Sequence, residues 1–389
     1  MKFTLKNNHK KKLKAFLKSK KAQIRGVDFA LALLIFIIAF SQVIIVLSNL
    51  LIPSLVQMEN YSQQKEVDKL FTNIFYTQGN PTNWGTTSTA GLSDFQLGLM
   101  GGNSELDFTK INRLTSDISD YWKLNYLNIK VSYGIVRDFA VSIYSPITIE
   151  IQDFTAAFGT ITLFGVVKEI MTPIEGADVW VVSVDENNNV ATNYTTTQNL
   201  SGDVKFQAVL NADETNHYTI VAFAQVGEIY QCYTVIRLEK ESSGLEYELA
   251  DFNFRPFVYK STNQLTSAIN VNYERESLSD EATAVVVFPF TGLGVTSYRQ
   301  SLVQTTLAST NIYQGTDIPI PANGLAVVVV NDRSDTTYTA GYMGIPMFQD
   351  DENGQIFAHS SFAEQTSYVS QTKTLLVRNI LLKCQIWYW

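Results

Sequence analysis

Residues 29–52 read FALALLIFIIAFSQVIIVLSNLLI, a run of twenty-four positions without a charged side chain. The polar residues within it are Ser41, Gln42, Ser48 and Asn49. The hydrocarbon core of a bilayer is about 30 Å thick, which takes about 20 apolar residues in a helix. The run is longer than the apolar region of a secretory signal peptide, and no small-residue cleavage site follows it. It predicts one membrane-spanning helix, which we place at residues 27–52.

Charge is distributed unevenly around this run. Ten Lys and Arg residues and no acidic residue precede Gly26. The rest of the chain therefore has 19 of the 29 Lys and Arg residues and all 37 acidic residues, a net charge of −18. Positively charged flanks stay in the cytoplasm. We therefore expect residues 1–26 to be a basic cytoplasmic leader and the bulk of the chain to be extracellular, at the cell membrane. A nucleic-acid-binding arm is the other interpretation of a basic leader, but an acidic exterior argues against nucleic acid as a partner. The spanning helix makes membrane lipid the expected partner.

The segment after the apolar run keeps helical spacing as far as Tyr76. Its apolar face is formed by Val67, Leu70, Phe71 and Ile74. Pro53 predicts a kink, and Gly79-Asn80-Pro81 predicts the end of the helix. A second helix is expected from Asp107, as its N-cap, to about Tyr126. Extended sequence follows, so we predict a membrane-proximal α+β unit at residues 53–157.

The rest of the chain has the pattern of short strands separated by polar turns. Strands are expected near 160–168, 177–184, 190–197, 203–210, 217–226 and 229–238, which predicts an antiparallel β-sandwich at residues 158–240. A further β-rich domain is expected at 241–389. Its valine runs at 282–290 and 325–331 indicate strands covered on both faces, and the apolar end Trp387-Tyr388-Trp389 should dock as a strand. The predicted fold class is mostly β with an N-terminal transmembrane helix.

Residues for hydrolytic chemistry are scarce, so we do not expect an enzyme. Outside the leader the chain has two histidines, His217 and His359, and no zinc-protease, nucleophile-elbow, P-loop or dinucleotide motif. We interpret His217 as a structural residue of a strand. His359 has no recognisable catalytic partner.

Metal and thiol chemistry are equally unsupported, so no cofactor is expected. The acidic runs 185–189 and 350–354 are interpreted as solvated turns. A calcium loop at 349–360 is the alternative, but Gln349 and Ser360 stand where acids belong. Cys232 and Cys384 are interpreted as two buried thiols, with a disulfide left open because an oxidising exterior permits one.

The junction Arg25-Gly26-Val27-Asp28 precedes the apolar helix directly. Asp28 has two interpretations, an N-cap of the helix and a group that acts in assembly. The junction resembles the class III signal peptide of archaeal type IV pilin-like proteins. This resemblance implies cleavage between Gly26 and Val27, and a mature helix that stays in the membrane or packs into a filament core. It also implies like subunits or pilus-type assembly machinery as partners. Bacterial pilins carry Glu at the fifth mature position, where this chain has Leu31.

Two further regions resemble known families. Residues 22–150 resemble a region of archaeal surface proteins with this type of N-terminus, through Gly79-Asn80-Pro81, Trp84 and the helix start Leu106-Asp107-Phe108-Thr109-Lys110. Residues 160–238 resemble the carboxypeptidase-regulatory-like, transthyretin-like sandwich. The matching residues are Gly165-Val166-Val167, Pro173-Ile174-Glu175-Gly176-Ala177-Asp178-Val179, Gly202-Asp203-Val204-Lys205-Phe206 and Tyr218-Thr219-Ile220. Both resemblances imply location and fold rather than a reaction.

The function predicted from these features is a single-pass, pilin-like cell-surface protein that displays extracellular β domains for structural or adhesive work. The alternative is a monomeric, membrane-tethered protein that binds envelope carbohydrate or a solute. In the alternative, exposed aromatic side chains of the β domains would stack on the ligand.

Overall fold

The computed structural model describes residues 4–87, 95–102, 104–115, 122–157, 159–211, 217–241, 246–262, 267–275, 281–290, 294–307, 310–334, 337–348, 355–358 and 368–389. These residues form a mostly β protein with one long apolar helix at the N-terminus, which confirms the predicted fold class. The chain divides into two compact units, Met1–Gln64 and Lys65–Trp389.

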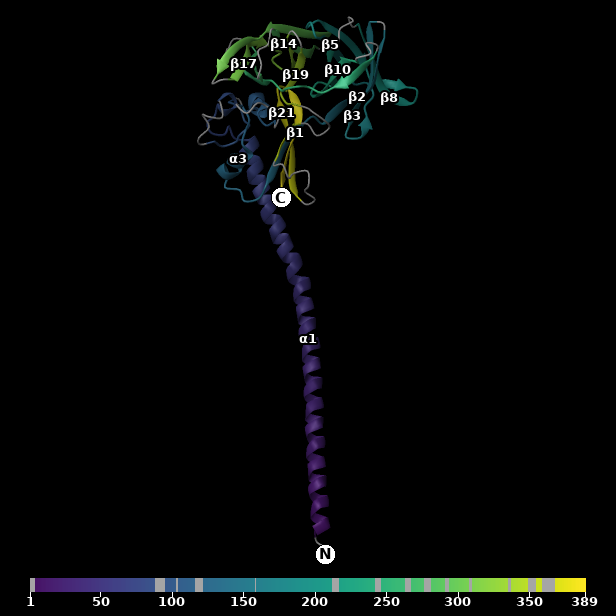
Figure 1. Cartoon of the computed structure of the whole chain (residues 1–389), viewed down its shortest axis with the longest axis vertical. Coiled ribbons are helices and arrows are strands. Elements are labelled where there is room, and N and C mark those ends of the chain that lie inside the picture. The colour runs from purple at the N-terminus through teal and green to yellow at the C-terminus, as the bar shows by residue number, and fades with distance from the viewer. Residues whose placement is uncertain are drawn as a thin grey trace. The chain divides into compact units, whose positions relative to one another are not determined.

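The helix α1 extends from Thr4 to Phe75 (Figure 1). Pro53 lies inside this helix. Every side chain from Val27 to Leu47 is exposed. The mean hydropathy reaches 2.9 in a stretch of 18 residues within Val27–Phe75. By length and composition α1 is able to cross a membrane. It also continues past Pro53, as the sequence predicts.

Residues 65–75 of α1 belong to the second unit and bury one face there. Val67, Phe71 and Ile74 are fully buried, and Leu70 is nearly so, which confirms the predicted apolar stripe. A short 3-10 helix, η1 (Trp84–Thr86), and two short helices, α2 (Phe108–Asn112) and α3 (Tyr126–Ser132), follow.

The predicted long helix from Asp107 to Tyr126 is wrong, although its start is right. Asp107 is an N-cap whose carboxylate accepts from the backbone N–H of Thr109 at 2.9 Å. The helix ends at Asn112 because the next side chain, Arg113, is held by backbone carbonyls of other segments. Its guanidinium donates to Trp84 O, to Thr87 O at 2.6 Å and to Trp122 O at 3.0 Å.

The last strand of the chain, β22 (Ile380–Tyr388), docks in a sheet as predicted. Its partners are β1 (Phe139–Tyr144) and β21 (Val369–Val377), and β20 (Gln355–Ala358) pairs with the other edge of β1. Alternate residues of β22 are buried. Because β22 pairs with β1, the predicted boundaries at 158 and 241 do not separate independent domains: residues 65–389 form one unit.

The predicted sandwich strands are present with nearly the predicted bounds. One sheet has the order β2-β3-β8-β7, with the short β4 paired to β3, and the other has the order β11-β10-β9-β5-β6. The strands are β2 (Ile147–Ala157), β3 (Thr160–Glu169), β4 (Thr172–Pro173), β5 (Asp178–Asp185), β6 (Val190–Thr196), β7 (Gln198–Leu200), β8 (Asp203–Asn211), β9 (His217–Val226), β10 (Tyr230–Lys240) and β11 (Tyr247–Ala250). The strand β2 pairs with β3 along its whole length, so the sandwich begins near residue 147 rather than 158.

Two more four-stranded sheets follow, β12-β13-β17-β16 and β15-β14-β18-β19. Their strands are β12 (Phe257–Lys260), β13 (Ala268–Arg275), β14 (Glu281–Phe290), β15 (Gly294–Ser301), β16 (Val303–Leu307), β17 (Thr310–Pro319), β18 (Ala326–Arg333) and β19 (Tyr338–Ile345). Successive valines of β14 and β18, such as Val285–Val287 and Val327–Val330, are fully buried. The predicted coverage of both faces is therefore confirmed.

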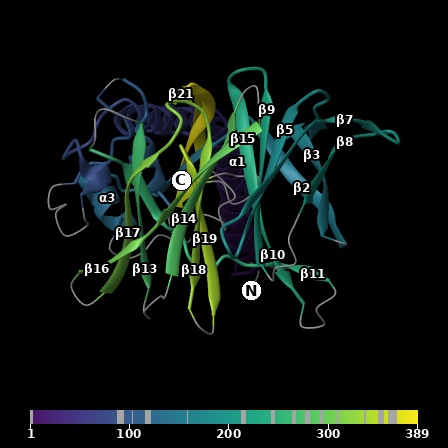
Figure 2. The same ribbon diagram turned by 90° about the horizontal axis from the view of Figure 1, so that it is seen from above.

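The sheet that contains β5 has hydrophobic cores on both faces. Along β5, Val179 and Val181 belong to the core inside the sandwich. Trp180, Val182 and Val184, on the other face, belong to a larger core that also holds β14, β18 and the end of α1. Figure 2 shows the teal sandwich strands beside the green strands of the later sheets. Successive side chains of β5 thus point alternately into the two hydrophobic cores.

Gly344 on β19 lies where this sheet contacts β10 of the sandwich, so a substitution at Gly344 can test the contact. A Cβ at this position would lie 1.9 Å from Tyr233 Oη and 2.4 Å from Met347 O. Tyr233 is fully buried on β10, and its hydroxyl donates to Met347 O at 3.0 Å. We expect Gly344→Ala to lower the free energy of unfolding by about 1–3 kcal/mol, the usual effect of overpacking.

The measurement is chemical unfolding of the detergent-solubilised full chain. Gly102→Ala is the matched control, because nothing lies within 4 Å of a Cβ built there. Equal stability of the two variants would contradict the close contact between β19 and β10.

Candidate functional site

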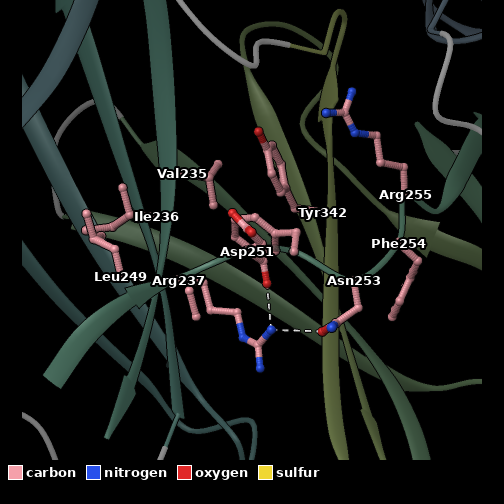
Figure 3. A pocket seen from close by; sticks show the side chains of 11 residues that line it. Val235, Ile236, Arg237, Leu249, Asp251, Asn253, Phe254, Arg255 and Tyr342 are labelled. Carbon is pink, nitrogen blue, oxygen red and sulfur yellow. Dashed lines mark hydrogen bonds between the residues drawn. The ribbon is translucent and has the colours of Figure 1, made fainter. Parts of the chain in front are cut away.

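A cavity of about 550 Å³ lies where the chain passes from the sandwich to the later sheets (Figure 3). Pockets that bind small molecules are often found at such junctions. The strands β10 and β11, the connecting segment 251–255 and β19 contribute to its wall. The lining residues are Val235, Ile236, Arg237, Leu249, Ala250, Asp251, Phe252, Asn253, Phe254, Arg255 and Tyr342.

Arg237 holds one side of this junction pocket together. Its side chain is 5% exposed, and its guanidinium donates to Asp251 O at 2.6 Å and to Asn253 Oδ1 at 2.8 Å (Figure 3). The guanidinium also lies 3.5 Å from a Glu239 carboxylate oxygen and 5.5 Å from the centre of the Tyr338 ring. Arg237 therefore fixes the connecting segment against β10.

The aromatic side chains of the pocket are fixed by the same segment. Phe252 packs edge-on against Tyr342 with ring centroids 4.5 Å apart. Phe254 stacks on Tyr273 at 4.6 Å, and its backbone forms a parallel bridge to Gly341. A Cβ on Gly341 would lie 2.3 Å from Phe254 O, so this approach requires glycine.

The pocket combines polar groups with aromatic rings. Asp251 and Asn253 are exposed at its rim and offer hydrogen-bond acceptors and donors, beside partly exposed rings. The eleven lining residues include no serine, cysteine or histidine. The sequence does not predict this pocket, because its lining residues follow no local motif.

His217 lies at the end of the sandwich nearest β19. Its ring stacks on Tyr338 with centroids 4.4 Å apart. Nε2 lies 3.9 Å from a Glu186 oxygen, and Nδ1 lies 3.9 Å from a Glu239 oxygen. Burial lowers the pKa of His217 below its usual value of 6.5. The carboxylates of Glu239 and Glu186 raise this pKa, but their effect is smaller than that of burial. The charge of Arg237 lowers the pKa further. The contacts fit the predicted structural role.

This shift predicts a pH dependence of stability. Between the lowered pKa of folded His217 and 6.5, the unfolded chain binds more protons than the folded chain. The free energy of unfolding should therefore fall as the pH falls through this window. We expect His217→Gln to remove this contribution, as measured by urea unfolding at several pH values across the window. The control His9→Gln, in the leader, should keep the slope; identical slopes for all three proteins would contradict the role of His217.

The predicted processing residues lie inside a helix. Arg25, Gly26, Val27 and Asp28 are all part of α1, and Val27 is 61% exposed. Because α1 begins at Thr4, Asp28 is not an N-cap in the uncleaved chain, and that interpretation is corrected. Its role in assembly and the cleavage after Gly26 stay predictions.

The turn 185–189 is not the solvated turn that the sequence predicts. Asp185 is 3% exposed and accepts from the backbone N–H groups of Asn187 and Asn189 at 2.8 and 2.7 Å. Asn331 on β18 donates to Asp185 O and Asn188 Oδ1, both at 2.9 Å. The turn therefore joins the sandwich to the next sheet. Residues 349–354 and His359 lie outside the described residues.

Both cysteines lie within the described ranges. Cys232 and Cys384 are buried free thiols, which confirms that interpretation over a disulfide, and burial raises the pKa of both. Among the described residues, no group of three or more His, Cys, Asp or Glu side chains is arranged to hold a metal ion.

Comparisons with known proteins do not assign a family. No family model and no curated protein match this chain. Among solved structures, a tetra-tandem repeat in the extending region of a large adhesion protein is similar at 14% identity and a TM-score of 0.20, over 52% of this chain and 49% of that chain. Red sea bream transglutaminase is similar at 12% identity and a TM-score of 0.19, over 56% of this chain and 33% of the transglutaminase chain. The third, MtrC from Shewanella baltica OS185, has 5% identity and a TM-score of 0.19, over 51% and 69%.

These similarities are too distant to carry an argument about function. The chain spans about half the length of the adhesion-protein structure. A β-rich unit that follows an apolar N-terminal helix is compatible with a membrane-anchored surface protein.

Proposed function

We propose that this chain is a single-pass, pilin-like membrane protein that displays its β unit on the cell surface for structural or adhesive work. The observation that carries the proposal is the exposed apolar helix joined to a large β unit. The ten cations before Gly26 support a cytoplasmic N-terminus and an extracellular β unit. The proposal is display rather than catalysis.

Mass spectrometry of the chain extracted from native membranes tests the pilin-like part. An N-terminus at Val27 is the expected result, and an intact leader would overturn pilin-type processing. Electron microscopy of sheared surface fractions tests assembly into filaments. The archaeal class III signal peptide and the carboxypeptidase-regulatory-like sandwich at 160–238 remain part of this proposal.

The junction pocket favours a second candidate, a membrane-tethered binding protein for envelope carbohydrate. Sugar faces stack on flat rings, and Phe252, Asp251 and Asn253 provide a ring and polar groups at one opening. Titration of the solubilised chain with a panel of soluble oligosaccharides tests it. Phe252→Ala should weaken binding, whereas Tyr298→Ala, an exposed ring outside the pocket, should not. Absence of binding in the whole panel would remove this candidate.

A further inference from the structure

The membrane-spanning part of α1 carries a heptad pattern on one face. This face is formed by residues at alternating spacings of three and four: Leu31, Leu34, Ile38, Ser41, Ile45, Ser48 and Ile52. A period of 3.5 residues is the signature of helices that pair in a left-handed supercoil. Ser41 and Ser48, one heptad apart on this face, are small and allow close approach of two helices in a membrane.

Polar side chains gather at the same face. Gln42 and Asn49 lie one heptad apart and directly follow Ser41 and Ser48. Three phenylalanines, Phe29, Phe36 and Phe40, lie on the opposite face, and Phe36 stacks on Phe40 with centroids 6.0 Å apart. The helix therefore has one bulky face suited to lipid and one face with polar groups.

The backbone next to Asn49 adds an independent observation. Pro53 lies inside α1 and has no N–H, so the carbonyl of Asn49 lacks its helical donor. The hydroxyl of Ser54 does not supply it, because this hydroxyl donates to Leu50 O at 2.9 Å and Leu51 O at 3.0 Å. The backbone carbonyl and the side-chain amide of Asn49 therefore both need hydrogen-bond partners.

Water is absent from the bilayer core, and an unpaired polar group there is unfavourable. Among the described residues, α1 is the only helix long and apolar enough to span a membrane. In that part of the chain, Gln42 and Asn49 are exposed and bond to no other residue. Gln42 lies near the middle of the predicted span at 27–52, so its partner must come from another molecule. Asn49 lies one heptad further along, three residues from the end of that span.

We propose that two copies of this chain pair in the membrane through the face formed by Ser41, Gln42, Ile45, Ser48 and Asn49. The proposal rests on the membrane anchoring proposed above. All copies insert in the same orientation, so the pair is parallel and each face meets its own copy. Amide and hydroxyl groups each contain a donor and an acceptor, so two identical polar faces satisfy each other. A partner of different sequence would need its own matching polar groups at two levels.

Cysteine cross-linking in membranes tests the pairing. The native thiols of Cys232 and Cys384 are buried, so the starting chain gives little background. Ser41→Cys and Ser48→Cys should form disulfide-linked dimers on mild oxidation of membrane vesicles. Val43→Cys and Leu47→Cys, on the phenylalanine side, are the controls. Equal cross-linking from both faces, or none from the polar face, would overturn the proposal.

A second variant separates polar contacts from simple crowding. Gln42→Leu with Asn49→Leu, in the Ser48→Cys background, should reduce the cross-linked fraction about tenfold, because interhelical hydrogen bonds each contribute modestly. Val43→Leu with Leu47→Val, on the phenylalanine side, is the matched apolar control and should leave the fraction unchanged. An unchanged fraction in the double leucine variant of the polar face would overturn the proposal.

Alkaline extraction of the same membranes tests the membrane anchor separately from the pairing. A chain that remains in the pellet without cross-linking overturns the pairing and keeps the anchor. A chain that is released overturns the anchor and the pairing together.

Discussion

Ile386→Asp is expected to unfold the second unit. Ile386 is fully buried in the middle of β22, where it lies opposite Val141 of β1 and Gln371 of β21. An aspartate there would place a carboxyl group in a hydrophobic core without a partner. We expect a loss of at least about 4 kcal/mol in the free energy of unfolding, the range reached by buried charges. Because whole domains have about 5–15 kcal/mol, the loss should prevent cooperative folding.

Circular dichroism and limited proteolysis of the detergent-solubilised chain measure this effect. Lys383→Asp is the matched control, since Lys383 is half-buried on the other face of the same strand. It should remain folded with a small change in stability. If Lys383→Asp is as destabilising as Ile386→Asp, the alternating burial of β22 does not describe the folded chain.

The strand pattern and the apolar helix could be predicted from local sequence. The valines of β14 and β18, the stripe at Val67–Ile74 and the docked chain end each depend on residues close together in sequence, and each was confirmed. The pairing of β1 with β22 could not be predicted this way. The two strands are separated by most of the second unit, and neither contains a signal that names its partner.

The errors have a common physical cause, which is contact with distant segments. Arg113 ends α2 because the carbonyls of Trp84, Thr87 and Trp122 surround its side chain. These carbonyls belong to other segments, so the helical periodicity of the sequence does not predict them. The turn at Asp185 is polar in sequence, yet Asn331 supplies its partner groups from β18. The junction pocket depends in the same way on Arg237, whose partners lie in the connecting segment.

Asp332→Ala is the second variant with a large expected effect. Asp332 is fully buried on β18. Its carboxylate accepts from the Tyr273 hydroxyl at 2.7 Å and forms an ion pair with Arg275, and both partners lie on β13 of the neighbouring sheet. Burial raises the pKa of Tyr273, and the bond to Asp332 raises it further, so the hydroxyl is protonated and donates.

Removing this carboxylate should cost about 3–5 kcal/mol, because it breaks a buried charge pair on one side only. Asp332→Asn should lose less, since an amide oxygen still accepts from Tyr273. The comparison is Glu281→Ala, which breaks an ion pair with Arg299 at 4.0 Å whose side chains are 57% and 51% exposed. An exposed pair of this kind contributes about 0–1 kcal/mol. Urea unfolding should give the lowest free energy of unfolding for Asp332→Ala, a higher value for Asp332→Asn and the highest value for Glu281→Ala. If Asp332→Ala and Glu281→Ala are equally stable, the contact between the two sheets depends on their apolar side chains rather than on Asp332.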